Sequence, residues 1–234
     1  MILPIVAGAA AMVAAGYNTM APRSQLYGRT FIGDRKQSRR LALTFDDGPN
    51  DPHTYRLLEV LERQGVKATF FMIGGFVRQR PEIARAVVDA GHVVGNHTMT
   101  HPNLIFRNAG EVRRELEDCE RAFDDAGVSH APLFRPPHGG RTPAVLRTVR
   151  RMGFETVMWS VSGWDWNPHS PEKIVSLVHK QIAGGDVILL HDGGHKQFGT
   201  DRSATVRATE LMLERFKGEG YEFVSIPKMI AGKN

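Results

Sequence analysis

The chain carries two short motifs whose residue types could bind a metal ion and move protons. In the hexapeptide TFDDGP, the adjacent carboxylates Asp46 and Asp47 stand directly before a turn-forming glycine and proline. In HTMTH, His97 and His101 are four residues apart, and one helical turn with this spacing would bring both imidazoles to the same metal ion. No glutamate follows His97, so the pair lacks the base of the HExxH zinc proteases, and a base has to come from another segment.

Each motif also has a structural explanation that needs no chemistry. Aspartates beside Gly-Pro are common in turns and helix caps. A chain with ten histidines contains pairs at helical spacing by chance. The functional interpretation therefore depends on whether the fold brings the motifs together.

The alternation of short apolar segments with longer amphipathic ones predicts an α/β fold. The expected strands cover residues 41–45, 68–73, 92–96, 133–135, 156–161, 187–190 and 221–226. The expected helices cover residues 53–64, 76–90, 111–126, 143–152, 171–182 and 204–217. A length of 234 residues suits a single domain of this class.

The candidate polar residues share one position, because each follows an expected strand at its C-terminal end. They are Asp46, Asp47, His97, Arg135, Asp165 and His191. The active sites of parallel barrels are built at this rim, whereas structural polar residues would be scattered over both ends. The sequence thus predicts one site made of side chains from several strands.

Five motifs in this order make the chain resemble the polysaccharide deacetylases, the NodB-like carbohydrate esterases of family four. The motifs are TFDDGP, HTMTH, RPPHG, WSVSGWDW and ILLHD. The resemblance runs from residue 41 to the C-terminus. It implies a distorted (β/α) barrel of the NodB-homology type and a metal-dependent hydrolase. The expected substrate is an N-acetylated polysaccharide, a peptidoglycan- or chitin-like polymer of N-acetylglucosamine.

The resemblance also implies a role for the first two motifs. Asp46 is expected to be the base that removes a proton from the attacking water, and Asp47, His97 and His101 are expected to hold one divalent ion. This donor set suits zinc, and cobalt, nickel and manganese are also compatible with it. Three protein ligands leave coordination positions open for water and the acetyl carbonyl.

The other expected site residues support the base, the acid and the substrate. Arg135 is expected to pair with Asp46, and Asp165 is expected to orient His191, the acid that protonates the leaving nitrogen. The expected substrate-binding residues are His138, through its backbone N–H, and the acetyl-pocket residues Trp166 and Leu189.

Several neighbouring polar residues have no clear place in this scheme. Ser162 stands where many relatives carry an aspartate, which leaves a detail of the site open. Asp192, Asp201 and His195 are given no role.

Two other functions are compatible with the same motifs. The site could hydrolyse O-acetyl esters on xylan-type glycans, because a complete metal, base and acid set attacks an ester as well as an amide. The chain could also be a noncatalytic carbohydrate-binding protein of the envelope. This second alternative is disfavoured, because a binding module need not retain Asp46 and His191 together with three metal ligands.

The N-terminus differs in character from the remainder of the chain. Residues 1–17 carry no charge and are rich in Ala, Val, Ile and Gly, which is typical of an export or anchor segment. The basic residues follow this run and none precedes it, and a buried hydrophobic helix is the alternative. We expect a hydrophobic anchor or signal-like segment over residues 1–21, a linker over 22–40 and the catalytic domain over 41–234. This organisation predicts a cell-envelope or secreted protein with membrane association through its N-terminus.

Overall composition is that of an ordinary soluble domain, with 41% hydrophobic and 24% charged residues. The net charge of +5 is modest, and no nucleic-acid motif accompanies the basic residues, so nucleic-acid binding is not expected. Cys119, the single cysteine, excludes an intramolecular disulfide and falls on the apolar stripe of an expected helix.

Overall fold

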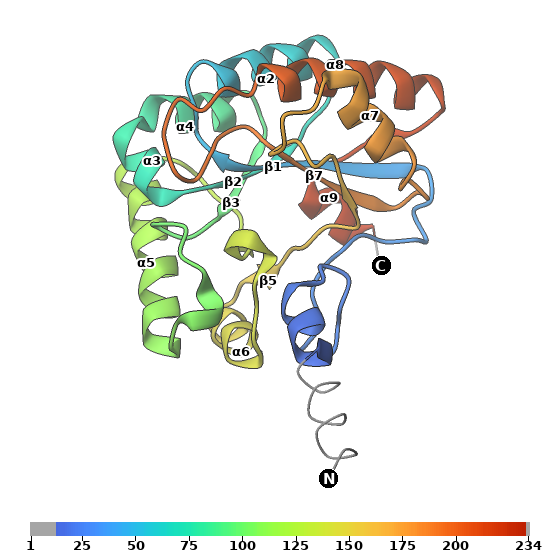
Figure 1. Ribbon diagram of the computed structural model, residues 1–234. Coiled ribbons are helices and arrows are strands. Elements are labelled where there is room, and N and C mark those ends of the chain that lie inside the picture. The colour runs from blue at the N-terminus through green and yellow to red at the C-terminus, as the bar shows by residue number, and fades with distance from the viewer. Residues whose placement is uncertain (1–12, 233–234) are drawn as a thin grey trace.

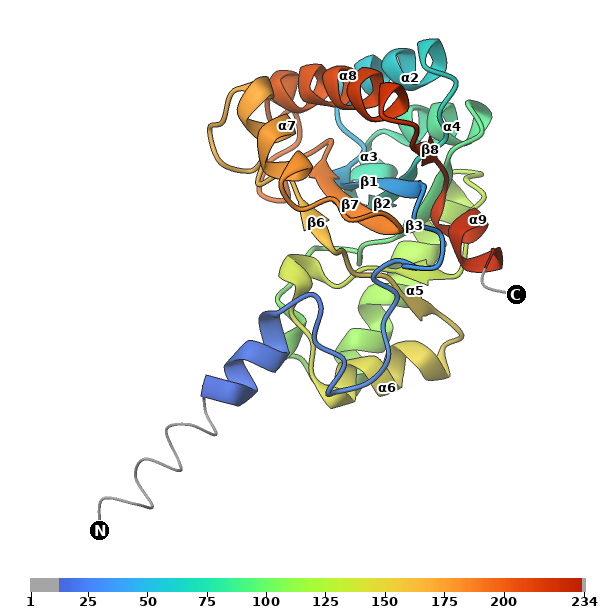
Figure 2. The ribbon, with the colours of Figure 1, turned by 90° about the vertical axis from the view of Figure 1, so that its right-hand side faces the viewer.

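Among the residues that the structure describes, eight parallel strands form the centre of the protein, in the order β5-β4-β3-β2-β1-β7-β6, with β8 paired to β1. The computed structural model describes residues 13–232. Helices cover the outside of the curved sheet, and the segment just before β1 lies beside its open part (Figures 1 and 2). The arrangement is a distorted, incomplete (β/α) barrel, which confirms the fold expected from the sequence.

The regular elements alternate along the chain, as the apolar pattern predicts. The strands are β1 (Arg40–Gly48), β2 (Thr69–Met72), β3 (Val93–Asn96), β4 (Leu133–Phe134), β5 (Glu155–Thr156), β6 (Val161–Ser162), β7 (Asp186–His191) and β8 (Glu222–Phe223). The α-helices that lie wholly within the described residues are α2 (His53–Arg63), α3 (Gly74–Gln79), α4 (Pro81–Asp89), α5 (Ala109–Asp125), α6 (Pro143–Arg151), α7 (Pro171–His179), α8 (Ser203–Gly218) and α9 (Ile226–Ala231). Two short 3₁₀ helices are η1 (Leu104–Phe106) and η2 (Pro137–Gly139).

Alternation along β1 divides the core into two layers. Leu41, Leu43 and Phe45 belong to the large cluster that packs the sheet against its helices. Ala42 belongs instead to a second cluster, which contains inward-facing residues of other strands and two residues of α9. Because successive strand residues face opposite sides, the even-numbered positions of β1 point into the barrel, and Asp46 continues that series. Helix α9 follows β8, which pairs with the first residues of β1, so it packs at the opposite end of the barrel from the carboxyl ends of the strands.

A segment before β1 lies along the gap between the two edge strands. Phe31 forms a parallel bridge with Val157, and Gly33 forms an antiparallel bridge with Asp186. Phe31 is buried at 3% exposure, so this part of the expected linker packs against the barrel. The division of the chain at residues 21 and 40 stays a prediction.

Three expected elements differ from those observed. The single helix expected over 76–90 is two helices, because Arg80 precedes Pro81 and takes a non-helical backbone with ψ of 64°. The strand expected over 156–161 is split between β5, which pairs with β4, and β6, which pairs with β7 at the other edge. The strand expected over 221–226 is only the short β8, and α9 begins at Ile226.

The expected membrane segment cannot be followed through the structure. Residues 1–12 lie outside the described residues, so an anchor or signal at the N-terminus stays a prediction. Within residues 13–232, no helix has the length and apolar character needed to cross a membrane.

Candidate active site

A bulge at the end of β1 brings two adjacent aspartates to one site. Asp46 pairs with His191 at the carboxyl end of β7. The register of β1 against β2 shifts between Asp46 and Gly48, and Asp47 adopts a left-handed backbone with φ of 71°. In a regular strand the side chain of Asp47 would point toward the helices. The bulge therefore allows both carboxylates to face the same cleft.

The two histidines of HTMTH are brought together by a loop. Strand β3 ends at Asn96, and both Thr98 and His101 have left-handed backbones, with φ of 68° and 57°. The Asn96 side-chain oxygen accepts a hydrogen bond from the Thr98 backbone N–H at 2.8 Å, and the Thr98 hydroxyl accepts one from the His101 backbone N–H at 3.0 Å. The expectation of one helical turn is wrong, because these local hydrogen bonds stabilise a turn instead.

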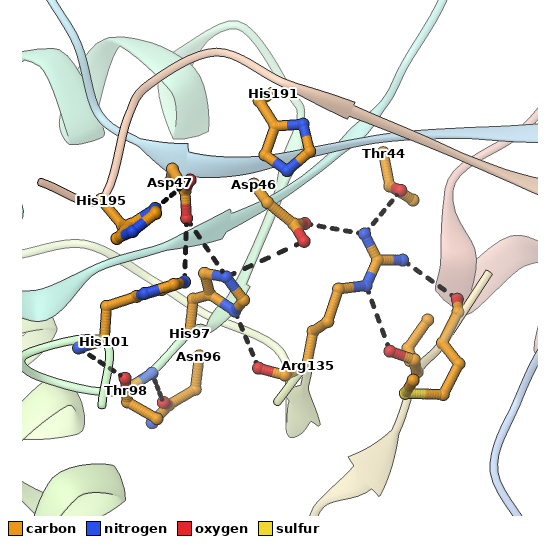
Figure 3. A network of polar contacts seen from close by, with 12 residues as sticks. Thr44, Asp46, Asp47, Asn96, His97, Thr98, His101, Arg135, His191 and His195 are labelled. Carbon is orange, nitrogen blue, oxygen red and sulfur yellow. Dashed lines mark hydrogen bonds and ion pairs between the residues drawn. The ribbon is translucent and has the colours of Figure 1, made fainter. Parts of the chain in front are cut away.

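Asp47, His97 and His101 form a buried group with the spacing of metal ligands (Figure 3). One ligand atom from each lies within 4.8 Å of the others. The Nε2 atoms of His97 and His101 are 3.4 and 3.2 Å from Oδ1 of Asp47. That oxygen is buried and has no hydrogen-bond partner among the described residues.

The protonation of this group favours a cation between its members. Nδ1 of His97 is 2.8 Å from the carbonyl oxygen of Arg135, so it donates there, and Nε2 is the nitrogen that faces the carboxylate. Burial lowers the pKa of His101 to about 4 against the opposing effect of Asp47, which keeps this imidazole neutral. When both imidazoles are neutral, their Nε2 atoms can offer lone pairs to a cation held beside the buried carboxylate oxygen. The three residues therefore fit a divalent ion.

Asp47 stays ionised in spite of its burial. Burial alone would raise the pKa of its carboxyl group. The nearby imidazoles of His101, His195 and His97 outweigh burial and hold the pKa well below its usual range. The carboxylate is thus in the form that binds metal ions.

Arg135 lies inside the barrel and fixes Asp46. Its guanidinium donates to Oδ1 of Asp46 at 2.7 Å and to the carbonyl oxygens of Val157 and Met158, each at 3.1 Å (Figure 3). It also stacks on the ring of Phe71, 4.2 Å from the centroid. Burial lowers the pKa of Arg135 from its ordinary value, while Asp46 opposes that effect. Because four groups hold the guanidinium, its charge and the orientation of Asp46 are set together.

His191 and Asp165 form a second buried ion pair across the cleft. Nδ1 of His191 is 2.8 Å from Oδ1 of Asp165, and the other carboxylate oxygen accepts hydrogen bonds from the His191 backbone N–H and the Thr205 hydroxyl. Burial alone would lower the pKa of His191, but Asp165 overcomes burial and raises it to about 9. The Nε2–H of a protonated imidazole is therefore available at neutral pH to donate into the cleft.

A cleft of about 540 Å³ joins these groups. The three residues expected to bind substrate also line it, namely His138, Trp166 and Leu189. Leu189 is buried at 2% exposure, whereas Trp166 is 44% exposed and its ring meets that of His191 edge-on at 5.4 Å. The structure thus brings every expected site residue to one place, and their individual roles stay predictions.

Comparison with known proteins agrees with this geometry. The family model named polysaccharide deacetylase matches residues 33–157, which is more than half of the chain. The chain belongs to the polysaccharide deacetylase family. The family expected from the five motifs is therefore confirmed, and with it the class of enzyme, a polysaccharide N-deacetylase.

Several deacetylases are similar to this chain over most of its length. A peptidoglycan-N-acetylglucosamine deacetylase of Bacillus cereus is 38% identical over 200 residues, covering 83% of this chain and 89% of that protein. A chitooligosaccharide deacetylase of a Bradyrhizobium species is 40% identical over 208 residues, covering 86% and 95%. A crystal structure of a peptidoglycan N-acetylglucosamine deacetylase bound to a substituted benzamide has a TM-score of 0.79 and 33% identity, covering 86% and 91%.

Sequence reasoning about the deacetylase site missed two residues next to the expected metal ligands. His195 lines the cleft, with Nδ1 3.6 Å from Oδ2 of Asp47. Asp192 is fully buried and accepts a hydrogen bond from the Thr54 hydroxyl at 2.5 Å, which joins the end of β7 to the start of α2. Burial raises the pKa of Asp192 to about 7, against the opposing effect of Thr54. The signal that the sequence offered for both residues was their position close to His191, in the segment ILLHDGGH.

Ser162 and Asp201 each accept a hydrogen bond from a loop backbone of the deacetylase. The Ser162 hydroxyl accepts a hydrogen bond from the Trp164 backbone N–H at 3.2 Å, where Trp164 has a left-handed φ of 53°. Asp201 accepts a hydrogen bond from the Ser203 backbone N–H at 2.9 Å, at the start of α8. Both contacts fix the backbone on either side of Asp165 and His191.

Replacing Asp165 with asparagine is expected to move the alkaline decline of deacetylase activity to lower pH. The carboxylate is what raises the pKa of His191 to about 9, so its loss leaves burial to lower that pKa. Above the new pKa, His191 loses the proton that it should donate. A pH–rate profile of kcat for the two proteins would measure the shift, and superimposable alkaline limbs would contradict the assignment.

The same substitution is also expected to lower the melting temperature by an amount that depends on pH. A raised histidine pKa contributes stability below the unfolded value near 6.5, and this contribution is lost as pH rises through about 9. The melting temperature of Asp165→Asn should therefore fall furthest below that of the unmodified protein at pH values below about 6.5 at which Asp165 is still ionised. The difference should shrink above about pH 9.

Proposed function

We propose that this chain is a metal-dependent hydrolase that removes acetyl groups from N-acetylated polysaccharide. The observation that carries the proposal is the convergence of three groups on one cleft. These are a carboxylate held by a buried arginine, a carboxylate with two histidines around an unpartnered oxygen, and a histidine with a raised pKa.

Asp46 is placed to accept a proton. One of its oxygens is held by Arg135, while Oδ2 lies 3.8 Å from Nε2 of His97, on the side of the expected metal ligands. A water molecule between Asp46 and the acetyl carbonyl would lose its proton to Oδ2 as its oxygen attacks the carbonyl carbon. Arg135 keeps the carboxylate oriented throughout this step. When bound by Asp47, His97 and His101, a divalent ion supplies Lewis-acid polarisation of the carbonyl and acidifies water.

His191 is placed to give a proton back. Its Nδ1 is engaged by Asp165, so Nε2–H is the donor that remains for the leaving nitrogen. An amine leaves poorly from a tetrahedral carbon unless it is protonated, and an imidazolium supplies that proton when the carbon–nitrogen bond breaks. The base thus activates the water that attacks the carbonyl carbon, and the acid protonates the nitrogen that leaves it.

The acetyl group would point its methyl toward the apolar part of the cleft. Leu189 and Trp166 line that part, and Trp166 also packs against the ring of His191. Relatives named for peptidoglycan and chitooligosaccharides support a β-linked N-acetylglucosamine polymer as the substrate. A glycan of the cell envelope would place the enzyme in the envelope or outside the cell, and zinc is the ion that we propose first for this donor set.

Acetate release from a panel of acetylated glycans tests the proposed function. Purified protein should release acetate from peptidoglycan or chitin oligosaccharides, lose that activity after removal of metal by a chelator, and regain it when zinc is added. The fall should be at least about a hundredfold, since metal-assisted activation of water contributes several kcal/mol to catalysis. Release of acetate from acetylated xylan alone would favour the O-acetyl ester activity, and release from no glycan would favour a binding protein.

A further inference from the structure

A second group of histidines stands at the edge of the catalytic cleft. His101, His138 and His195 each offer a ring nitrogen within 4.8 Å of the other two. The rings of His101 and His195 stack with centroids 4.5 Å apart, and the ring of His138 meets them edge-on at 4.6 and 5.1 Å. Three imidazoles are a donor set that protein zinc sites use.

The ring nitrogens of this group have few other partners. Nδ1 of His101 is buried and has no hydrogen-bond partner within residues 13–232, in a residue that is only 8% exposed. The ring of His138 contacts those of His101 and His195. Nδ1 of His195 is 3.6 Å from Oδ2 of Asp47, which is too long for a hydrogen bond. A cation would give the buried Nδ1 of His101 the partner that it lacks within these residues.

Two of the three residues are held in strained backbone conformations. His101 and His138 have φ of 57° and 56°, a left-handed region that side chains other than glycine rarely adopt. His138 takes this left-handed conformation itself, although the residue that follows it in the turn is a glycine. Such strain at a cleft indicates that the positions of these two rings serve a function.

We propose that His101, His138 and His195 form an outer divalent-cation site, separate from the inner group of Asp47, His97 and His101 and sharing His101 with it. A zinc- or cobalt-type ion is the expected occupant. Nitrogens bound tetrahedrally to one such ion are about 3.3 Å apart, given bonds of about 2.0 Å. His138 and His195 are exposed, so small rotations of their side chains bring the nitrogens to that spacing.

Sharing His101 couples the two sites. A neutral imidazole binds a metal ion through one nitrogen, so the outer ion gains His101 only when the inner ion is left with Asp47 and His97. The outer site also lacks a carboxylate, and we expect it to bind more weakly than the inner one. An excess of metal would fill it and narrow the cleft, which His138 and His195 line.

The outer site is tested by removing the inner one while keeping His101. A variant with Asp47→Ala and His97→Ala should still bind one Co²⁺ per chain in a calorimetric titration of metal-free protein. Its visible absorption should show tetrahedral cobalt bound to nitrogen. Adding His138→Ala and His195→Ala should weaken this binding at least about tenfold, because two of three ligands are lost. No cobalt binding in the Asp47→Ala, His97→Ala variant, once it is shown to be folded by circular dichroism, would overturn the proposal.

A matched control removes two histidines elsewhere. His169→Ala with His179→Ala, added to the same background, should leave cobalt binding unchanged, since neither residue lines the cleft. An equal loss in this control would show nonspecific binding to surface histidines and would overturn the proposal.

The unmodified protein provides a second measurement that does not depend on the folding of the inner-site variant. After one equivalent of Zn²⁺ is bound, further Zn²⁺ should produce a weaker binding event and inhibit acetate release. The pair His138→Ala and His195→Ala should abolish both effects of excess zinc and retain the first equivalent. A weaker event that persists unchanged in this pair would contradict the outer site. Failure of the first equivalent to bind would count against the proposed function instead.

Discussion

Replacement of Asp46 with asparagine should lower the rate of N-deacetylation by about 10²- to 10⁴-fold, the range that positioned proton transfer contributes. Asparagine keeps the shape of the side chain and an oxygen that can accept the 2.7 Å hydrogen bond from Arg135. It has no carboxylate to take the proton from water. Because Asp47, His97 and His101 are intact, metal content should remain at about one ion per chain. Acetate release and elemental analysis of the same sample measure the two quantities.

The controls for this variant separate lost chemistry from lost stability. Asp46→Asn leaves the buried guanidinium of Arg135 without its ionic partner, so a lower melting temperature is expected. Asp118→Asn makes the same chemical change on the exposed surface of α5 and should retain full activity. If Asp46→Asn kept nearly full turnover with metal bound, Asp46 would not be the base. A variant that had lost both metal and activity would point to a ligand role instead.

Replacement of His191 with alanine should affect two kinds of substrate unequally. Cleavage of the amide should fall by about 10²- to 10⁴-fold, because the leaving nitrogen needs a proton. Hydrolysis of an activated aryl acetate should fall much less, since a phenolate leaves without protonation. The ratio of the two kcat/KM values, measured on the same protein preparation, reports the role of the acid.

The structure provides two checks on this result. Asp165 still accepts hydrogen bonds from the residue 191 backbone N–H and from the Thr205 hydroxyl, so the fold should tolerate the change. His179→Ala removes a histidine outside the cleft and should leave both rates unchanged. Equal losses on the amide and the aryl acetate would show that His191 does not act as the acid.

The family and the general plan of the fold were predictable from the sequence. Five motifs in order are specific enough to indicate the family, and apolar periodicity reported the alternation of strands and helices. The rule that parallel strands carry functional residues at their carboxyl ends then predicted the convergence of Asp46, His97, Arg135 and His191. These features depend on local patterns and on short connections, which a sequence displays directly.

The details that set the site's geometry depend on backbone contacts that the residue pattern does not reveal. Asp47 enters the cleft because β1 bulges against β2, and a strand pattern alone would turn its side chain toward the helices. His97 and His101 meet through a left-handed loop held by Asn96 and Thr98, although their spacing suits a helix. The strain at Asp47 is offset by pairing between distant strands, whereas the strain in the histidine loop is offset by short-range hydrogen bonds.

The placement of His195 shows the same limit most clearly. Its local sequence offers only its closeness to His191, and it lies far along the chain from His101 and His138. The three rings meet only because the end of β7, the loop after β3 and the turn after β4 occupy one rim of the barrel. Strand order in the sheet determines which loops are neighbours. The sequence therefore identified the motifs, and the tertiary structure alone decided which further side chains stand beside them.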